Sequence, residues 1–200
     1  MEINVLLFDD AELLDWAGPV EVFQSAARFV PDPVTIRFLG YGNQRIHSGG
    51  LVLYCNGLWG GDKKLFPDLV ILPGGSGVKR LYTDMTKNNL QNLLQSGASI
   101  ASVCTGSLLL AHAGLLDGRD ATTHHENIDQ LARMAPDCHI QRNVRYTDSS
   151  PVFTAAGVSA GIDLALWLVA RKWGLDLATQ TANFMEYPSD GIKQPEHTND

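Results

Sequence analysis

The sequence predicts a doubly wound α/β domain, in which a mostly parallel sheet carries helices on both faces. Short apolar runs alternate with helical stretches over one uninterrupted length, without an internal repeat or an interdomain linker. The run 100–103 is small or β-branched and stops directly before Cys104, as a buried parallel strand that leads into a helix does. We expect one domain over residues 1–187 and a polar tail over residues 188–200.

The expected elements follow from apolar periodicity and from glycine and proline positions. Parallel strands are expected at 3–8, 33–41, 68–72 and 100–103, with a short strand at 121–125. Antiparallel pairs are expected within 46–58 and between 144–148 and 152–155. A Gly-Pro break predicts a first helix that has Pro19 at its first position and runs to about residue 28. Further helices are expected at 77–82, 87–95, from 105 to the closing Gly114, 126–134, 158–173 and 175–185.

Composition excludes several classes of function. The 200 residues are 44% hydrophobic and carry a net charge of −7 without a Lys/Arg cluster, so we expect no nucleic-acid partner. No run of eighteen apolar residues and no signal-like start is present, so we expect no membrane partner. The cysteines, Cys55, Cys104 and Cys138, are odd in number and lack C-x-x-C spacing, which indicates a cytoplasmic protein without disulfides or zinc.

Cys104 is the first candidate for chemistry. A cysteine where a strand stops and a helix starts lies at the carboxyl end of the sheet, where the turn exposes its side chain to a reactant. The helix N-terminus would favour the thiolate, which is the nucleophilic form. The alternative is a small buried cysteine packed behind a helix. Cys55 lies in the antiparallel excursion and is expected to be inert.

Three further positions meet the same sheet edge. Asp15 follows the first strand and either caps a turn or reaches across the edge to Cys104. Gly74 and Gly75 end the strand at 68–72, where they either form a plain turn or let the backbone approach a ligand. The neighbours His124 and His125 would point to opposite faces of an extended segment and make a poor metal pair. A structural role is expected for them, although one could face Cys104.

With these pieces in place, the chain resembles the ThiJ/PfpI superfamily of class-I glutamine-amidotransferase-like proteins. The resemblance covers about residues 3–187. Its motifs are L-D-W-A-G-P at 14–19, L-P-G-G at 72–75, S-V-C-T-G-S at 102–107, G-L-L-D-G-R at 114–119 with A-T-T-H at 121–124, and G-V-S-A-G-I-D at 157–163. The resemblance implies a flavodoxin-like three-layer sandwich with a nucleophile elbow at Cys104.

Two groups within the superfamily are the most similar: isonitrile hydratases and the ligand domains of AraC-type regulators. The regulators continue into a DNA-binding domain, which these 200 residues do not contain, so we expect that architecture to be excluded. Protease-like members carry a histidine directly after the nucleophile, where this chain has Thr105, so a peptidase would lack its general base. Other members carry a glutamate beside the cysteine, and Asp15 would take that role here. The segment after Pro188 differs from the hydratases, which leaves the substrate range open.

The resemblance implies that the Cys104 thiolate attacks an isonitrile carbon to give a thioimidate, which water resolves to an N-substituted formamide. Asp15 would be the acid, and the N–H groups of Gly75 and Thr105 would stabilise negative charge. Substrate would bind along Gly74, Gly75 and Thr105, without a metal or an organic cofactor. The alternatives are a redox-responsive or ligand-sensing module without turnover, and a glyoxalase-like scavenger of electrophiles. A homodimer is implied as well, with the apolar first helix taking part through Val22 and Phe23.

Overall fold

The computed structural model describes residues 1–61 and 67–188. Within these residues a seven-stranded sheet has the order β10-β11-β7-β6-β1-β2-β5. All neighbouring strands pair in parallel except β10 and β11, which form the antiparallel hairpin at one edge. The strands are β1 (Glu2–Leu7), β2 (Thr35–Gly40), β5 (Gly57–Leu58), β6 (Leu69–Leu72), β7 (Ser99–Val103), β10 (Tyr146–Ser149) and β11 (Val152–Ala155). The predicted α/β class and mostly parallel sheet are therefore confirmed.

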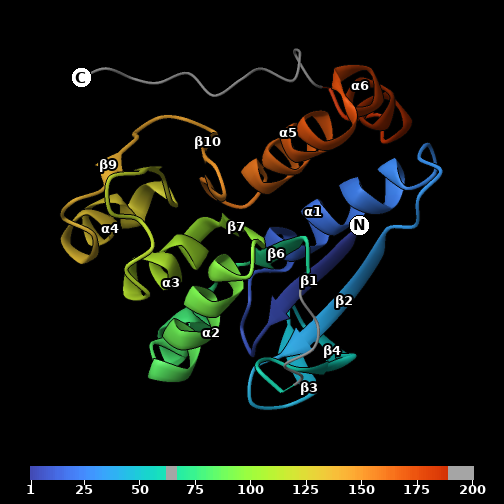
Figure 1. The fold of residues 1–200 in the computed structure, drawn as a ribbon. Coiled ribbons are helices and arrows are strands. Elements are labelled where there is room, and N and C mark those ends of the chain that lie inside the picture. The colour runs from blue at the N-terminus through green and yellow to red at the C-terminus, as the bar shows by residue number, and fades with distance from the viewer. Residues whose placement is uncertain (62–66, 189–200) are drawn as a thin grey trace.

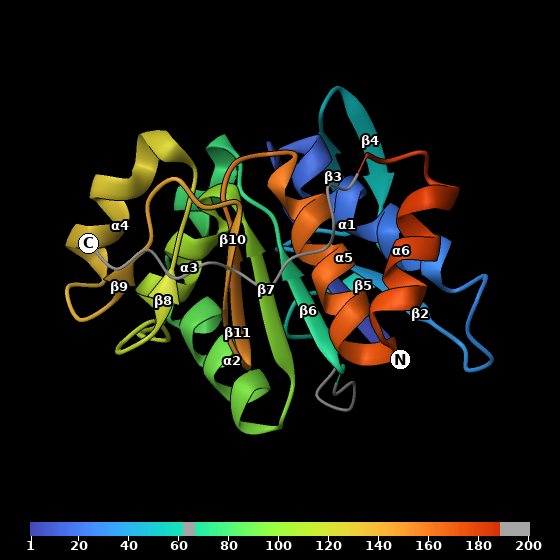
Figure 2. The ribbon, with the colours of Figure 1, turned by 90° about the horizontal axis from the view of Figure 1, so that it is seen from above.

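Helices cover both faces of this sheet (Figures 1 and 2). One layer consists of α1 (Leu13–Ala26), α5 (Ala160–Trp173) and α6 (Leu175–Phe184), and the other of α2 (Asp84–Gln95), α3 (Ser107–His112) and α4 (Ile128–Met134). Short 3-10 turns are η1 (Ser76–Leu81), η2 (Cys104–Gly106) and η3 (His125–Asn127). Strand β6 lies fully buried between the two layers, and β7 is buried except for its first residue, Ser99, as their short runs of apolar and small residues predict.

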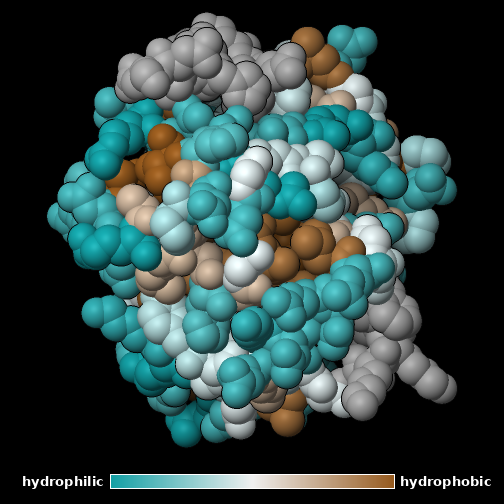
Figure 3. All heavy atoms as spheres, turned by 60° about the vertical axis from the view of Figure 1, so that its left-hand side comes forward, coloured by the Kyte–Doolittle hydropathy of each residue, from teal (hydrophilic) through white to brown (hydrophobic). Residues whose placement is uncertain are grey.

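Two pairs of short strands lie outside the main sheet, one antiparallel and one parallel. Strands β3 (Arg45–Ser48) and β4 (Leu51–Tyr54) form the antiparallel excursion expected within 46–58. Strands β8 (Asp120–Ala121) and β9 (His139–Ile140) pair in parallel, and the second of them was not predicted because two residues carry no periodicity. The face shown in Figure 3 is mostly hydrophilic, with apolar residues gathered in a recessed strip across its middle.

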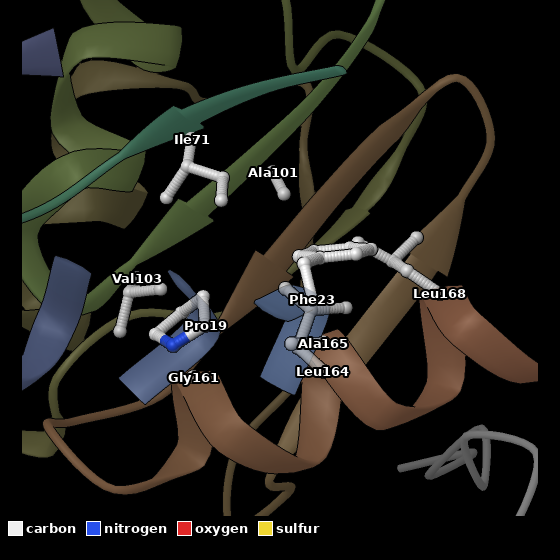
Figure 4. A pocket seen from close by; sticks show the side chains of 9 residues that line it. All are labelled: Pro19, Phe23, Ile71, Ala101, Val103, Gly161, Leu164, Ala165 and Leu168. Carbon is white, nitrogen blue, oxygen red and sulfur yellow. The ribbon is translucent and has the colours of Figure 1, made fainter. Parts of the chain in front are cut away.

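The first helix differs from its prediction. Pro19 lies inside α1, which begins six residues earlier at Leu13, and the helix ends at Ala26. Gly18 does not break the helix: a Cβ there would lie 2.9 Å from Cγ1 of Ile162, so the glycine lets α1 approach α5 closely. Figure 4 shows Pro19 and Phe23 of α1 facing Gly161 and Leu164 of α5 against the strands β6 and β7. The Gly-Pro pair therefore serves helix packing.

The helix after Cys104 is also shorter than expected. Residues 104–106 form a 3-10 turn and α3 spans only Ser107–His112. In the part of the chain that the structure describes, no helix is long and apolar enough to cross a membrane. The expected polar tail, residues 188–200, lies outside the described residues except for Pro188.

Candidate active site

The backbone of Cys104 forms a strained elbow between β7 and η2. Its φ of 57° lies in the left-handed region, which is unusual for a residue other than glycine. The surroundings hold it there: the N–H of Cys104 donates to the carbonyl of Ala156 at 2.9 Å, and its own carbonyl accepts the hydroxyls of Thr123 at 2.9 Å and Ser107 at 3.2 Å. The structure therefore places Cys104 at the strand-to-helix junction that the sequence predicts.

The sulfur is buried but surrounded by donors. Cys104 is only 7% exposed, so the exposed side chain expected of an elbow is not what the structure shows. The N–H and hydroxyl of Thr105 and the N–H of Val158 all donate to the sulfur. These three groups can stabilise negative charge on sulfur when the thiol proton leaves.

Asp15 reaches the same sulfur from the first turn of α1. Its side chain is fully buried and hydrogen-bonded to Cys104, while its Oδ2 accepts the N–H of Gly74 at 2.9 Å. Its Oδ1 is buried and has no hydrogen-bond partner among the residues that the structure describes. Burial is the main cause that raises the pKa of Asp15 to about 7, against the lowering effect of the Gly74 N–H. A carboxyl group with this pKa can both give and take a proton near neutrality.

The thiol itself is not poised as a free thiolate. Burial, followed by the charge of Asp15, raises the pKa of Cys104 to about 12, although its three donors pull the other way. The sequence led us to expect a thiolate stabilised by a helix N-terminus. Because α3 has only six residues and the sulfur is desolvated, burial outweighs that effect.

The Pro-Gly-Gly turn approaches the elbow as closely as backbone can. A Cβ on Gly74 would lie 2.5 Å from the nitrogen of Thr105, and Gly75 has a φ of 128°. The N–H of Gly75 donates to Oγ1 of Thr105 at 3.0 Å. The Gly75 N–H, expected to stabilise negative charge on an intermediate, therefore orients the Thr105 hydroxyl in this structure.

Two contributors were not predicted from the sequence: Val158 as a sulfur donor and Thr123 as a support for the elbow. Both belong to motifs that carried the family resemblance, so a motif signal was present, but nothing in their residue types indicated contact with Cys104. His124 lies against the same loop, since a Cβ on Gly157 would meet its Cδ2 at 2.4 Å. Its ring lies tilted against that of His125, with centroids 4.3 Å apart. Within residues 1–61 and 67–188, no group of His, Cys, Asp or Glu could hold a metal ion.

The other two cysteines are buried and free. The sulfur of Cys138 donates to the carbonyl of Arg119 at 3.2 Å, and burial raises the pKa of Cys138 to about 11. Burial raises the pKa of Cys55 as well. Among the described residues, Cys104 alone of the three cysteines is hydrogen-bonded to both a carboxyl group and several donors.

A profile of the DJ-1/PfpI family matches residues 1–171. The chain belongs to the DJ-1/PfpI family. A crystal structure of a ThiJ/PfpI family protein from Pseudomonas syringae superposes with a TM-score of 0.82 at 27% identity, covering 94% of this chain and 76% of that one.

Two relatives of this DJ-1/PfpI chain have the same sequence identity to it but bear the names of an enzyme and of a transcriptional regulator. Isonitrile hydratase from Pseudomonas putida is 34% identical over 94% of this chain and 78% of its own length. The HTH-type transcriptional regulator CdhR from Pseudomonas aeruginosa is 34% identical over 88% of this chain and 52% of its own. The chain thus spans about half the length of that regulator.

Proposed function

We propose that this protein is a cysteine-dependent hydratase that converts an isonitrile, R–N≡C, into an N-substituted formamide. The observation that carries the proposal is the buried contact between Cys104 and a carboxyl group whose pKa is about 7. Addition of a thiol to an isonitrile places both the sulfur and a proton on the same terminal carbon. A nucleophile and an acid that touch each other meet that demand, and similarity to an isonitrile hydratase supports it.

The first step uses the single proton that the pair holds. Asp15 accepts the thiol proton as the sulfur attacks the isonitrile carbon, forming the C–S bond while the carbon lone pair develops. Asp15 then delivers that proton to the carbon, which gives the thioimidate R–N=CH–S–Cys104. The donors from Thr105 and Val158 stabilise sulfur while it carries charge.

The second step consumes one water molecule. Asp15, now ionised, takes a proton from water as the oxygen attacks the thioimidate carbon, and it passes that proton to the nitrogen. The intermediate R–NH–CH(OH)–S–Cys104 then breaks its C–S bond, its hydroxyl proton returns to the pair, and the formamide R–NH–CHO leaves. The sum is one isonitrile and one water for one formamide, with no redox change.

A ligand-sensing module without turnover is the alternative function with support of its own, because the regulator CdhR is as identical to this chain as the isonitrile hydratase is. A redox-responsive role fits the site less well, because a thiol whose pKa is raised to about 12 is mostly protonated and reacts slowly with oxidants. The three free thiols suit the reducing cytoplasm, in which we propose that the reaction takes place.

The test is an activity screen of the purified protein. Aliphatic and aromatic isonitriles are incubated with the protein, and formamide is measured by mass spectrometry. A 2-oxoaldehyde is included as a substrate for the alternative glyoxalase-like activity. We expect formamide from at least one isonitrile, complete loss in Cys104→Ala, and wild-type rates in Cys138→Ala as the matched control. Absence of formamide from every isonitrile would refute the hydratase, and saturable isonitrile binding without product would favour the sensing module.

A further inference from the structure

The loop 156–159 carries one of the sulfur's three donors in a strained backbone. Its residue Val158 donates its N–H to Cys104 and has a φ of 41°. A β-branched residue in the left-handed region is a genuine outlier, and such strain persists only where neighbouring groups hold it. Something outside the loop must therefore keep this donor in place.

Arg145 contacts both ends of the loop. Its backbone carbonyl accepts the N–H of Ala156 at 2.9 Å, and its Nη2 donates to the hydroxyl of Ser159 at 3.2 Å. Ala156 in turn accepts the N–H of Cys104. Arg145 thus contacts the loop on either side of Val158, at the backbone of Ala156 and at the hydroxyl of Ser159, and Ala156 also contacts the backbone of the nucleophile.

Two further side chains fix the Arg145 guanidinium. Its Nε donates to Oδ2 of Asp163, in the first turn of α5, at 2.7 Å. The hydroxyl of Tyr187, which follows α6, donates to the other oxygen, Oδ1, at 3.0 Å. The described contacts of these three side chains include neither the Cys104 sulfur nor Asp15, so any effect on the chemistry is transmitted through the loop.

We propose that Arg145, Asp163 and Tyr187 are positioning residues, which hold the Val158 N–H on the sulfur of Cys104 from outside the site. The inference rests on the proposed role of Cys104 as the nucleophile, and not on which electrophile it attacks. Its consequence is that removing a hydroxyl or a guanidinium at some distance from the sulfur should change the ionisation of the thiol.

The decisive comparison is Tyr187→Phe against Tyr41→Phe. Each change removes one partly buried hydroxyl: that of Tyr187 is hydrogen-bonded to Asp163 and Arg145, and that of Tyr41 to Thr83. The readout is the rate at which iodoacetamide alkylates Cys104 as a function of pH, with mass mapping of the labelled cysteine. We expect Tyr187→Phe to slow alkylation at pH 8 about twofold and Arg145→Met about fivefold, while Tyr41→Phe leaves it unchanged. Arg145→Lys, which keeps the charge but cannot hold both partners, should fall between wild type and Arg145→Met.

A merely structural role predicts a different pattern. It would lower thermal stability in Tyr187→Phe and Tyr41→Phe alike and leave the pH profile of alkylation unmoved. Wild-type profiles in both Tyr187→Phe and Arg145→Met, or equal slowing in Tyr41→Phe, would overturn the proposal. If Arg145→Met does not fold, the two Tyr variants decide. If the variants change alkylation as expected but the wild-type protein makes no formamide, the hydratase proposal is wrong and the positioning role stands.

Discussion

Asp15 and Cys104 behave as one titrating unit because they are buried in contact with each other. The pKa of Asp15 is raised to about 7 and that of Cys104 to about 12, mainly by burial in both cases. Between these values the pair holds a single proton, which rests on sulfur or on the carboxyl group. The form with the proton on Asp15 is the reactive one, since only then is the sulfur a thiolate.

This sharing predicts an unusual pH dependence for the thiol. Alkylation of Cys104 should rise with pH to a midpoint near pH 7 and then level off, because the form with one proton is complete above the pKa of Asp15. In Asp15→Asn the midpoint near pH 7 should vanish, and the rate should follow the thiol alone. Iodoacetamide rates from about pH 5.5 to about pH 9 measure this. A wild-type midpoint near that of an ordinary cysteine would contradict the shared proton.

Turnover should depend on Asp15 more strongly than alkylation does. Asp15→Asn cannot deliver a proton to the isonitrile carbon, so kcat should fall about a hundredfold or more. Alkylation should fall much less, because loss of the carboxylate charge also removes a cause that raises the pKa of the thiol. Parallel measurement of formamide production and alkylation rate checks this. A variant as active as wild type would remove the role assigned to Asp15 and leave the hydratase.

Asp15 should also lower the free energy of unfolding of the protein when it is ionised. A carboxyl group whose folded pKa is raised binds more protons in the folded than in the unfolded state, so stability falls as pH rises from about 4 to about 7. The rise from 3.8 to about 7 corresponds to about 4 kcal/mol above neutrality. Asp15→Asn should therefore raise Tm clearly at pH 8 and little at pH 4. Equal shifts of Tm at pH 4 and pH 8 would show that the stabilisation is unrelated to the ionisation of Asp15.

At the scale of single residues, the sequence indicated that Cys104 and Asp15 form the site but did not indicate their pKa values. Cys104 was predicted from the strand before it and the helix after it, and Asp15 from the preceding strand and the family motif. Their pKa values depend on how far the folded chain removes both groups from water, which no local pattern reports. Thr123 and Val158 were missed for a related reason, since they reach Cys104 through contacts between segments far apart in the chain.

At the scale of elements, the elbow depends on close backbone approach. A Cβ on Gly106 would lie 2.2 Å from the carbonyl oxygen of Leu72, so any side chain there must push η2 away from β6. We expect Gly106→Ala to lower the free energy of unfolding by about 1–3 kcal/mol and to slow alkylation of Cys104. Gly57→Ala is the control, because its Cβ would make ordinary contact at 3.4 Å. Denaturant unfolding of both variants tests this, and equal stability would contradict it.

The order of the elements was predictable because each core strand is a short apolar run between breakers. Helix boundaries were less predictable. Pro19 was expected to start α1, whereas the helix begins at Leu13 and contains the proline. The reason is tertiary, since Gly18 and Pro19 pack against Ile162 and Gly161 of α5. The same residues that resemble a break in isolation are the ones that allow two helices to approach.

The whole molecule leaves one strand edge apolar. Val22 and Phe23, expected at a dimer contact, are fully buried inside the protomer, so that expectation about the surface is wrong. In the described chain, β4 pairs only with β3, and its residues Leu51, Val52 and Tyr54 are 48%, 46% and 78% exposed. On its other side the hairpin contacts the start of α1, where Nε1 of Trp16 donates to the hydroxyl of Ser48 at 3.1 Å. An uncharged, exposed edge strand invites pairing with another strand.

We propose that two copies of the chain pair through this edge, since a twofold axis brings identical β4 strands together antiparallel. Light scattering at micromolar concentration should then give about twice the chain mass of 21.8 kDa. Val52→Lys should yield monomers, because a lysine on the edge opposes pairing. Phe184→Lys, which alters an exposed apolar residue on α6, should stay dimeric. A monomeric wild type would refute the dimer, whereas dimers of Val52→Lys together with monomers of Phe184→Lys would move the contact to α6.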